Sequence, residues 1–199
     1  MKSLFLVSGG LDSTAGMYRF REMDYDCMTI DYGQRAFKEQ VKYARINCEK
    51  LGKRLIEVNM KKVGDYFREG KSLIPHEPIR HRNAVTIPFA LTYASEMGYS
   101  AVYVFTVSEE CQYESNKPEI ISALRKLAEA LRIGLIFPFL GLSKAHVLRM
   151  GIEHGMDPLN TYSCLLGHRV HCGRCSQCES RKMAFKIAGV DDKTKYLWQ

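Results

Sequence analysis

The amino-acid sequence predicts an α/β fold, a doubly wound and mostly parallel sheet of about five strands with a C-terminal helical extension. Short apolar runs alternate with helix-like segments over residues 1–157, and this alternation is typical of parallel strands joined by crossover helices. The first apolar run ends in two glycines. Residues 158–199 differ in kind, because they hold four of the seven cysteines and a final helix-like segment. We therefore divide the chain into a core of residues 1–157 and an extension of residues 158–199 packed on it.

Each predicted strand is a short run of apolar or β-branched residues. The first, SLFLVS (3–8), is almost continuously apolar, which suits a central strand buried on both faces. The five predicted strands are residues 3–8, 26–33, 53–60, 99–107 and 134–140.

The predicted helices follow apolar residues at helical spacing and local start and stop signals. Gly52 suits a helix C-terminus, Pro118 a first helical position and Ser143 an N-cap. Pro88 should lie in the first turn of its helix or kink it. Residues 61–80 carry mixed charges and two prolines, so we expect a loop there. The helices are expected at 12–23, 36–52, 84–97, 117–132, 143–155 and 178–188.

The composition fits a soluble protein that handles anions. Lys and Arg exceed Asp and Glu by 29 − 22 = 7, which suits nucleoside triphosphates and a solvated basic surface equally well. No apolar run reaches the length of a membrane span, and the N-terminal apolar run is too short for a signal peptide. We expect a cytoplasmic protein without a membrane partner.

The stretch LVSGGLDST (6–14) has the chemistry of a phosphate-binding loop. Glycines at positions 9 and 10 let backbone N–H groups close on an oxyanion, and the following helix adds the positive end of its dipole. Asp12 could cap that helix, bind Mg²⁺, or do both. A plain strand-to-helix turn is the alternative. The candidate nucleotide-binding residues here are Leu6, Val7, Ser8, Gly9, Gly10, Leu11, Asp12, Ser13 and Thr14.

Two familiar nucleotide loops, G-x-x-x-x-G-K-[ST] and G-x-G-x-x-G, are absent, which disfavours P-loop kinases and dinucleotide oxidoreductases. The stretch instead resembles the SGGxDS PP-loop of the N-type ATP pyrophosphatases. Those enzymes cleave ATP between its α and β phosphates, adenylate an oxygen of the acceptor and release pyrophosphate. The resemblance also implies an adenine nucleotide alpha hydrolase-like fold.

Four cysteines in the pattern C-x₇-C-x₂-C-x₂-C predict one structural zinc site, formed by Cys164, Cys172, Cys175 and Cys178. A cluster like this in a reducing compartment indicates metal rather than disulfides. Four thiolates leave no open coordination position, so the metal would not be catalytic. His168 or His171 in place of one cysteine, an iron–sulfur cluster, and unligated cysteines are the alternatives.

Several further motifs occur in order along the chain. They are DYGQR (31–35), RN (82–83), SKA (143–145), TYSC (161–164) and CGRCSQCESR (172–181). Together with the glycine loop they resemble the 7-cyano-7-deazaguanine synthase family, called QueC or ExsB, over nearly the whole chain. Members of that family convert 7-carboxy-7-deazaguanine, ammonia and ATP into a nitrile that feeds queuosine or archaeosine synthesis.

The resemblance implies roles for individual residues. The loop from Ser8 to Thr14 would hold pyrophosphate and Mg²⁺. The second strand, through Ile30, Asp31 and Tyr32, would border the adenine. Asp12, Arg82 and Lys144 would be catalytic, the two cations neutralising the α-phosphate and the developing charge. Asn83 either contacts substrate or caps a helix. The resemblance also implies a homodimer and no direct contact with nucleic acid.

The chain departs from the family in residues 107–120, VSEECQYESNKPEI, where a D-x-S-x-Y-P-D-C-R-like segment is expected. Three alternatives therefore stay open. One is a relative that adenylates a different carboxylate. Another is a PP-loop enzyme that thiolates tRNA, for which Cys111 is the sulfur-relay candidate. The last is a zinc-containing nucleic-acid-binding protein that is not an enzyme.

Overall fold

The computed structural model describes residues 1–69 and 76–198, and its described part contains a sheet of five parallel strands in the order β3-β2-β1-β4-β5. This confirms the predicted fold class. Because β1 lies centrally and successive strands are added first on one side and then on the other, the chain reverses direction across the sheet between β1 and β4. The strands are β1 (Ser3–Leu6), β2 (Tyr25–Asp31), β3 (Leu55–Asn59), β4 (Ala101–Val104) and β5 (Gly134–Ile136).

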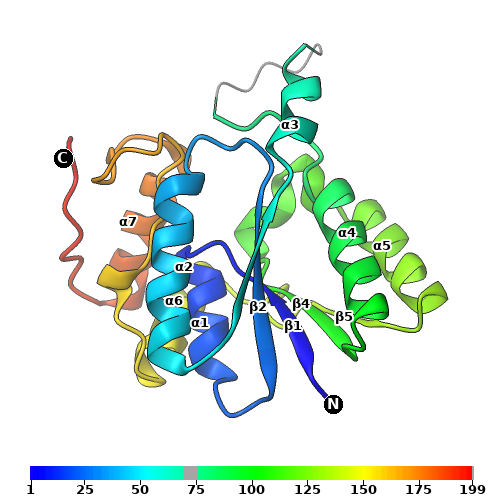
Figure 1. Ribbon diagram of the computed structural model, residues 1–199. Helices are drawn as coiled ribbons and strands as arrows, with labels where there is room; N and C mark the ends of the chain where they lie inside the picture. The colour runs from blue at the N-terminus through cyan, green and yellow to red at the C-terminus, as the bar shows by residue number, and fades with distance from the viewer. Residues whose placement is uncertain (70–75, 199) are drawn as a thin grey trace.

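Helices cover both faces of the sheet (Figure 1). One face carries α1 (Leu11–Arg19), α2 (Phe37–Leu51), α6 (Lys144–Glu153) and α7 (Ser176–Ala188). The other carries α4 (Asn83–Glu96) and α5 (Pro118–Ala130). A further helix, α3 (Lys61–Arg68), lies beyond the carboxyl ends of the strands, at the top of the view.

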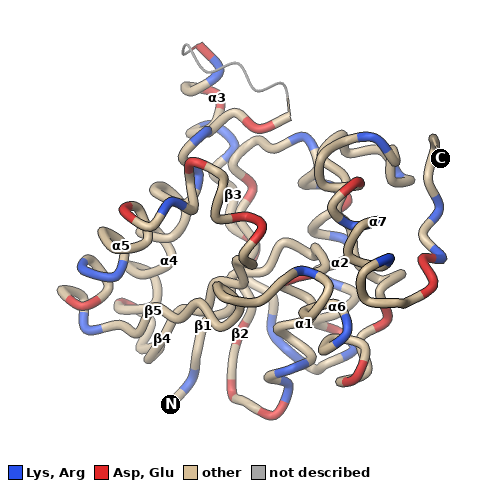
Figure 2. Tube along the Cα trace, turned by 180° about the vertical axis from the view of Figure 1, so that it is seen from behind, with Lys and Arg blue, Asp and Glu red and all other residues tan. Residues whose placement is uncertain are grey.

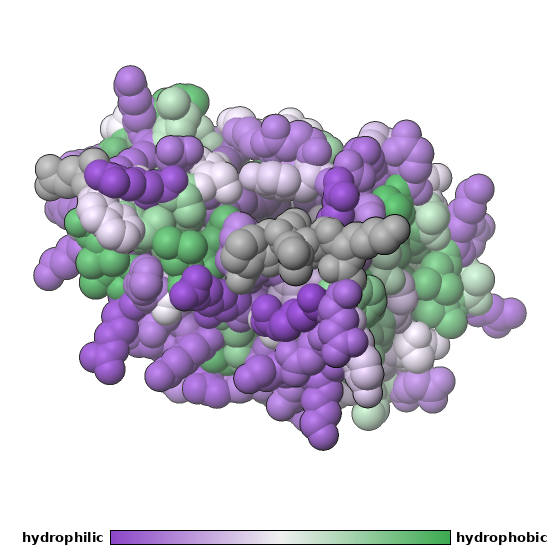
Figure 3. Space-filling view, turned by 90° about the horizontal axis from the view of Figure 1, so that it is seen from above, coloured by the Kyte–Doolittle hydropathy of each residue, from purple (hydrophilic) through white to green (hydrophobic). Residues whose placement is uncertain are grey.

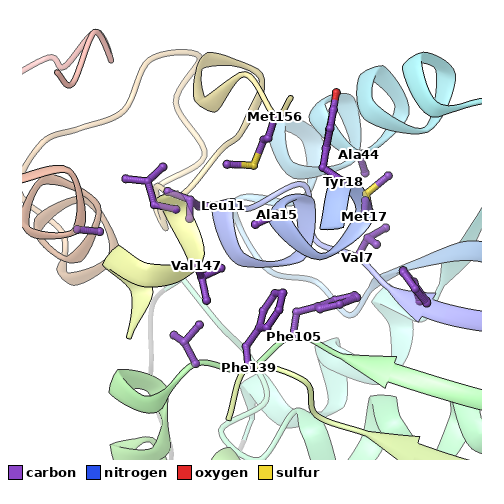
Figure 4. Close-up of a cluster of buried hydrophobic side chains, with 14 of the residues drawn as sticks. Val7, Leu11, Ala15, Met17, Tyr18, Ala44, Phe105, Phe139, Val147 and Met156 are labelled. Carbon is purple, nitrogen blue, oxygen red and sulfur yellow. The ribbon is translucent and has the colours of Figure 1, made fainter. Parts of the chain in front are cut away.

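The alternation of side chains along the strands divides the core in two. Phe5 and Val7 of the first strand belong to the cluster beneath α1 and α6, whereas Leu4 packs on the opposite face against α4 and α5. Figure 4 shows Val147 of α6 pointing toward Phe105 and Phe139, with α1 beside them. Burial on both faces explains why the first strand is apolar throughout.

Local signals in the sequence correctly mark three helix ends. Gly52 ends α2 in the left-handed conformation with φ 61°. Pro118 is the first residue of α5, and Ser143 caps α6 by accepting a hydrogen bond from the backbone N–H of His146 at 3.2 Å.

One expectation about the segments around the site is wrong, and one of two alternatives for Pro88 is excluded. The predicted loop over 61–80 contains α3, and residues 70–75 of it lie outside the described part of the chain. Mixed charges and prolines favoured a loop there, but a Cβ at Gly64 would collide with the backbone carbonyl of Tyr32, so glycine lets α3 dock against the end of β2. Pro88 lies inside α4 and not in its first turn, and a kink there stays a prediction.

The C-terminal extension packs on the α1, α2 and α6 side of the sheet (Figure 1). Arg181 of α7 is 1% exposed and donates to Thr161 Oγ1 at 2.7 Å and to the carbonyl oxygen of Pro158 at 2.7 Å. This buried guanidinium ties the helix to the segment that carries Cys164. The boundary at residue 157 stays a prediction.

Charged residues are spread over helices on both sides of the sheet, without a face of one sign (Figure 2). None of the helices in residues 1–69 and 76–198 combines the length and apolar character needed to cross a bilayer.

Candidate nucleotide and acceptor site

A pocket of about 400 Å³ lies at the carboxyl ends of the neighbouring strands β1 and β4, where the chain leaves β1 for α1 on one face of the sheet and leaves β4 for α5 on the other. Open parallel sheets bind ligands at this switch point. Viewed from above the strands, the surface around this end is mostly hydrophilic, with apolar patches to either side (Figure 3). The wall of the pocket is formed by the ends of β1, β2 and β4, the first turns of α1 and α4, and residues 108–116.

The glycine loop joins β1 to α1 at one end of this pocket. Gly9 has φ 67°, and a Cβ there would collide with the carbonyl oxygen of Gln40 on α2. Ser13 Oγ accepts a hydrogen bond from the backbone N–H of Ser8 at 3.2 Å, and Ser8 Oγ accepts one from Gly10 at 3.2 Å. The loop is thus fixed by its own backbone and by close contact with α2, and it presents the N-terminus of α1 to the pocket.

A buried cluster of charges forms next to the loop. Lys144, at the start of α6, is 5% exposed, and its Nζ lies 3.1 Å from Asp12 Oδ2 and 3.6 Å from Glu110 Oε1. The amine also donates to Gln177 Oε1 at 3.3 Å. The first residue of α6 and the first turn of α1 thus place the Lys144 amine and the Asp12 carboxylate in contact.

The surroundings of Asp12 leave one of its oxygens available. Oδ1 of Asp12 is buried without a hydrogen-bond partner in the described part of the chain, and so is the hydroxyl of Thr14. Burial raises the pKa of Asp12 to about 6, against the lowering effect of Lys144. Although burial favours a neutral amine, Asp12 and Glu110 raise the pKa of Lys144 above its usual value. A carboxylate oxygen without a partner among the described residues, beside the glycine loop, is a type of ligand that Mg²⁺ prefers.

A second cation, Arg82, lies at the N-terminus of α4 and is held by a residue that sequence reasoning missed. Its Nη1 donates to Glu77 Oε2 at 2.7 Å, and the hydroxyl of Tyr32 donates to Glu77 Oε1 at 3.4 Å. The Glu77 side chain is 18% exposed. It joins the end of β2 to the first turn of α4. Nothing in the pattern of the predicted loop marks this carboxylate.

The structure brings most predicted nucleotide residues to one pocket. Arg82, Lys144 and Asp12 line it, but Gly9 and Thr14 are not among the described lining residues, because Gly9 faces α2 and Thr14 is fully buried. The other predicted residues that line it are Leu6, Val7, Ser8, Gly10, Leu11, Ser13, Ile30 and Tyr32. Lining residues that the sequence analysis did not single out for this site include His76, Glu77, Arg80, Asn116 and Gln177.

Residues 108–116, which depart from the family pattern, form the other end of the pocket. They fold into two 3-10 helices, η1 (Ser108–Gln112) and η2 (Glu114–Asn116). Glu110, Tyr113 and Asn116 line the pocket, whereas Cys111 is not among the lining residues and donates to the carbonyl oxygen of Val107 at 3.7 Å. This position gives no support to Cys111 as a sulfur relay.

The four predicted cysteines converge as a candidate metal site. Their sulfur atoms all lie within 4.8 Å of one another, and those of Cys172 and Cys178 are 3.8 Å apart. A tetrahedron with metal–sulfur bonds of about 2.3 Å has edges of about 3.8 Å, so the spacing fits four thiolates on one ion. Backbone N–H groups also donate to the sulfurs, for example from Cys175 to Cys172 Sγ at 3.2 Å.

Neither of the two histidines considered as alternative ligands replaces a cysteine in the cluster. His171 Nε2 accepts a hydrogen bond from the backbone N–H of Ser163 at 3.0 Å, and its ring packs beside Tyr162. Burial and the neighbouring Arg181 lower the pKa of His171 to about 4, so the ring is neutral and able to accept. His168 is exposed. The cluster is therefore best described as a four-cysteine site.

Comparison with known proteins gives a consistent picture across the chain. Residues 2–189 match the family model described as "Queuosine biosynthesis protein QueC". The chain is 48% identical to "7-cyano-7-deazaguanine synthase 1" of Sulfurisphaera tokodaii, covering 99% of this chain and 98% of that protein. It is 32% identical to the 7-cyano-7-deazaguanine synthase of Acinetobacter baylyi, covering 100% of this chain and 96% of the relative.

Solved structures share the fold at low identity. The NMN synthetase of Francisella tularensis superposes with a TM-score of 0.61 at 12% identity, over 96% of this chain and 78% of that one. The U34-tRNA thiolase NcsA of Methanococcus maripaludis superposes with a TM-score of 0.56 at 16% identity, over 100% of this chain and 76% of the other. These likenesses concern the architecture alone.

Proposed function

The chain belongs to the QueC family, and we propose that it is a carbon–nitrogen ligase that uses ATP to convert 7-carboxy-7-deazaguanine and ammonia into 7-cyano-7-deazaguanine. Relatives that match almost the full chain carry that activity in their names. The observation that carries the proposal at atomic level is the Lys144–Asp12 pair, 3.1 Å apart, set beside the glycine loop in a pocket that continues to residues 108–116.

The glycine-loop end of the pocket is proposed to hold ATP. Backbone N–H groups at the start of α1 and the hydroxyls of Ser8 and Ser13 are suited to pyrophosphate oxygens. Ile30 and Tyr32, at the end of β2, line the wall on which adenine would pack. Asp12 is the residue proposed to hold Mg²⁺, which when bound supplies positive charge to the phosphate oxygens.

The chemistry requires two activations of one carbon. An acceptor carboxylate oxygen attacks the α-phosphorus of ATP, and the bond to pyrophosphate breaks. Ammonia then attacks the activated carbon, AMP leaves with the carboxylate oxygen, and an amide remains after a proton is lost. A second ATP activates the amide oxygen in the same way, and loss of AMP and of the remaining N–H protons gives the nitrile.

Arg82 and Lys144 are proposed to stabilise the negative charge that develops as pyrophosphate and AMP leave. Lys144 is buried and paired with carboxylates, so it stays protonated and fixed in position before the reaction begins. A cation that is already oriented costs no reorganisation in the transition state. The ion pair with Glu77 likewise fixes the position of the Arg82 guanidinium.

The four-cysteine site is proposed to bind one structural Zn²⁺. Its thiolates fill all positions of a tetrahedron, so the metal has no place for substrate. Residues beside the ligands, Ser163, Leu165, Ser176 and Gln177, line the pocket. The ion would therefore fix one wall of the site without taking part in the reaction.

The direct experiment combines the purified protein with Mg·ATP, ammonium and 7-carboxy-7-deazaguanine. We expect AMP, pyrophosphate and the nitrile, identified by mass spectrometry, and none of them with an Asp12→Ala plus Ser13→Ala variant. AMP formed with another carboxylic acid but not with this one would keep the reaction and reject the acceptor. No AMP with any acid would reject the proposal.

A further inference from the structure

The pocket end opposite the glycine loop contains a pair of side-chain amides whose orientation the structure fixes. Asn83 is the first residue of α4 and lines the pocket, and Asn116 ends η2 with 2% of its surface exposed. The Nδ2 group of Asn83 donates to Oδ1 of Asn116. The pair thus joins the first turn of α4 to residues 108–116.

The polarity of this pair is determined by a backbone carbonyl. Nδ2 of Asn116 donates to the carbonyl oxygen of Glu110 at 3.1 Å. A carbonyl oxygen can only accept, so Asn116 must turn its NH₂ group toward it and its own oxygen toward Asn83. Asn83 in turn must present NH₂ to Asn116. Its Oδ1 has no hydrogen-bond partner among the described residues and remains for a ligand.

The helix does not use Asn83 as a cap. Arg82 occupies the N-cap position of α4, and no side chain caps this helix. The backbone N–H groups of Ala84 and Val85 are satisfied by the carbonyl oxygens of His81 and Arg82 instead. A structural role at the helix terminus therefore does not account for a pocket-lining asparagine whose amide orientation is fixed.

We propose that Asn83 is a specificity-determining residue that accepts a hydrogen bond from the N–H edge of a guanine-type acceptor, with Asn116 as the positioning residue that orients it. The inference rests on the proposed function. A guanine-type ring offers two adjacent donors, N1–H and the 2-amino group, whereas an adenine-type ring has an acceptor at N1 and no 2-amino group. An orientation-locked amide oxygen favours the first and repels the second.

The test measures binding of two acids by calorimetry without ATP. These are 7-carboxy-7-deazaguanine and its adenine-type analogue, which lacks both donors. Wild type should prefer the guanine-type acid at least tenfold, and Asn83→Ala should lose most of that preference, with ATP binding changed less than about twofold. Asn83→Asp keeps an acceptor and should retain part of the preference. Asn59→Ala, an exposed asparagine outside the pocket lining, is the matched control.

A variant of Asn116 tests the positioning role. Asn116→Ala leaves the Asn83 side chain in place but frees it to rotate, so the ratio of the two affinities should fall while both acids still bind. Thermal denaturation checks that each variant is folded.

The possible failures can be told apart. Wild-type protein that does not bind the guanine-type acid would reject the proposed acceptor and this assignment together. Wild-type binding with an unchanged affinity ratio in Asn83→Ala would overturn the assignment of Asn83 alone and leave the proposed function standing.

Discussion

The two ends of the pocket are built by different means. The glycine loop is local: Ser8, Gly10 and Ser13 bond to one another within six residues of chain, and the loop conformation depends on backbone geometry. The opposite end is assembled from residues 76–83 and 108–116, and side chains hold it together through the Glu77–Arg82 ion pair and the amide pair of α4 and η2.

We expect the two ends to differ in how substitutions affect them: the loop end in phosphate binding, and the opposite end in the choice of acceptor. Backbone N–H groups bind phosphates whatever acceptor is used, and few sequences can form such a loop. Side-chain pairs such as Asn83–Asn116 depend on the two residues that meet and not on the backbone of a single loop, so the acceptor end can be altered by single substitutions. Substitutions should therefore abolish turnover at the loop and shift selectivity at the other end.

The largest expected effect concerns the four-cysteine cluster, whose neighbouring residues line one wall of the pocket. On the proposal that the cysteine cluster binds Zn²⁺, treatment with a chelator or the substitution Cys172→Ser should lower the melting temperature by more than about 10 °C and abolish activity, because metal binding would contribute directly to folding. Scanning calorimetry with and without chelator measures this. Cys111→Ser is the control, and an equal loss in that variant would contradict a specific role for the cluster.

At the glycine-loop end, Lys144→Met should lower kcat/KM by about 10³-fold, because two carboxylates lose their buried counter-charge and the leaving group loses a preoriented cation. Initial-rate kinetics of AMP release provide the measurement. Lys2→Met removes an ion pair with Asp26, 2.8 Å long and remote from the pocket, and should change kcat/KM less than about twofold. Similar losses in both variants would indicate general destabilisation.

Ionisation of the buried Asp12 carboxyl at the glycine-loop end should lower the stability of the folded protein above pH 6. Burial raises the pKa of Asp12 from 3.8 to about 6, so the folded state binds its proton more tightly than the unfolded state. Stability contributed by this group is therefore present below pH 4 and lost as the pH rises through 6. Asp12→Asn lacks this loss, so its advantage in unfolding free energy over wild type should grow by up to about 3 kcal/mol between pH 4 and pH 7. Denaturant titrations at several pH values measure it, and a constant difference would contradict the shift.

Gly9→Ala tests the backbone basis of the loop. A methyl group at φ 67° meets the Gln40 carbonyl oxygen on α2, so the variant should lose at least about 2 kcal/mol of stability and bind ATP weakly. Gly52→Ala is a close match, since that residue has φ 61° but nothing within 4 Å of an added Cβ. Equal losses of stability in the two variants would show that backbone strain, and not the contact with α2, accounts for the effect.

The smallest expected effect is at the acceptor end. Glu77→Gln keeps one acceptor oxygen for Arg82 but puts an NH₂ group where the Tyr32 hydroxyl now donates, and it removes the charge that pairs with the guanidinium. Arg82 should therefore be held less firmly, and kcat should fall about tenfold with little change in the melting temperature. Steady-state kinetics beside thermal denaturation distinguish the two. A large fall in stability with unchanged kcat would make Glu77 structural.

The same contrast explains what could be predicted. The Ser143 cap and the convergence of the four cysteines are set by neighbouring residues, so their patterns predicted them correctly. The glycine loop lies between β1 and α1 as expected, and its role in binding nucleotide stays a prediction. Glu77 and the Asn83–Asn116 pair depend on contacts between segments 5 to 33 residues apart, and no local pattern records which side chains meet there. Helix α3 was missed because the mixed charges and prolines of residues 61–80 favoured a loop, whereas the docking of Gly64 against Tyr32 is a contact that no local pattern records.

The central claim is that one carboxylate carbon is activated twice through its oxygens. The direct measurement uses 7-carboxy-7-deazaguanine with both carboxylate oxygens replaced by a heavy isotope, and analyses AMP and product by mass spectrometry. The account predicts that every AMP released carries one heavy oxygen on its phosphate and that the nitrile carries none. Unlabelled AMP formed together with the nitrile would contradict it, because the phosphate would then have reacted with water and not with the acceptor.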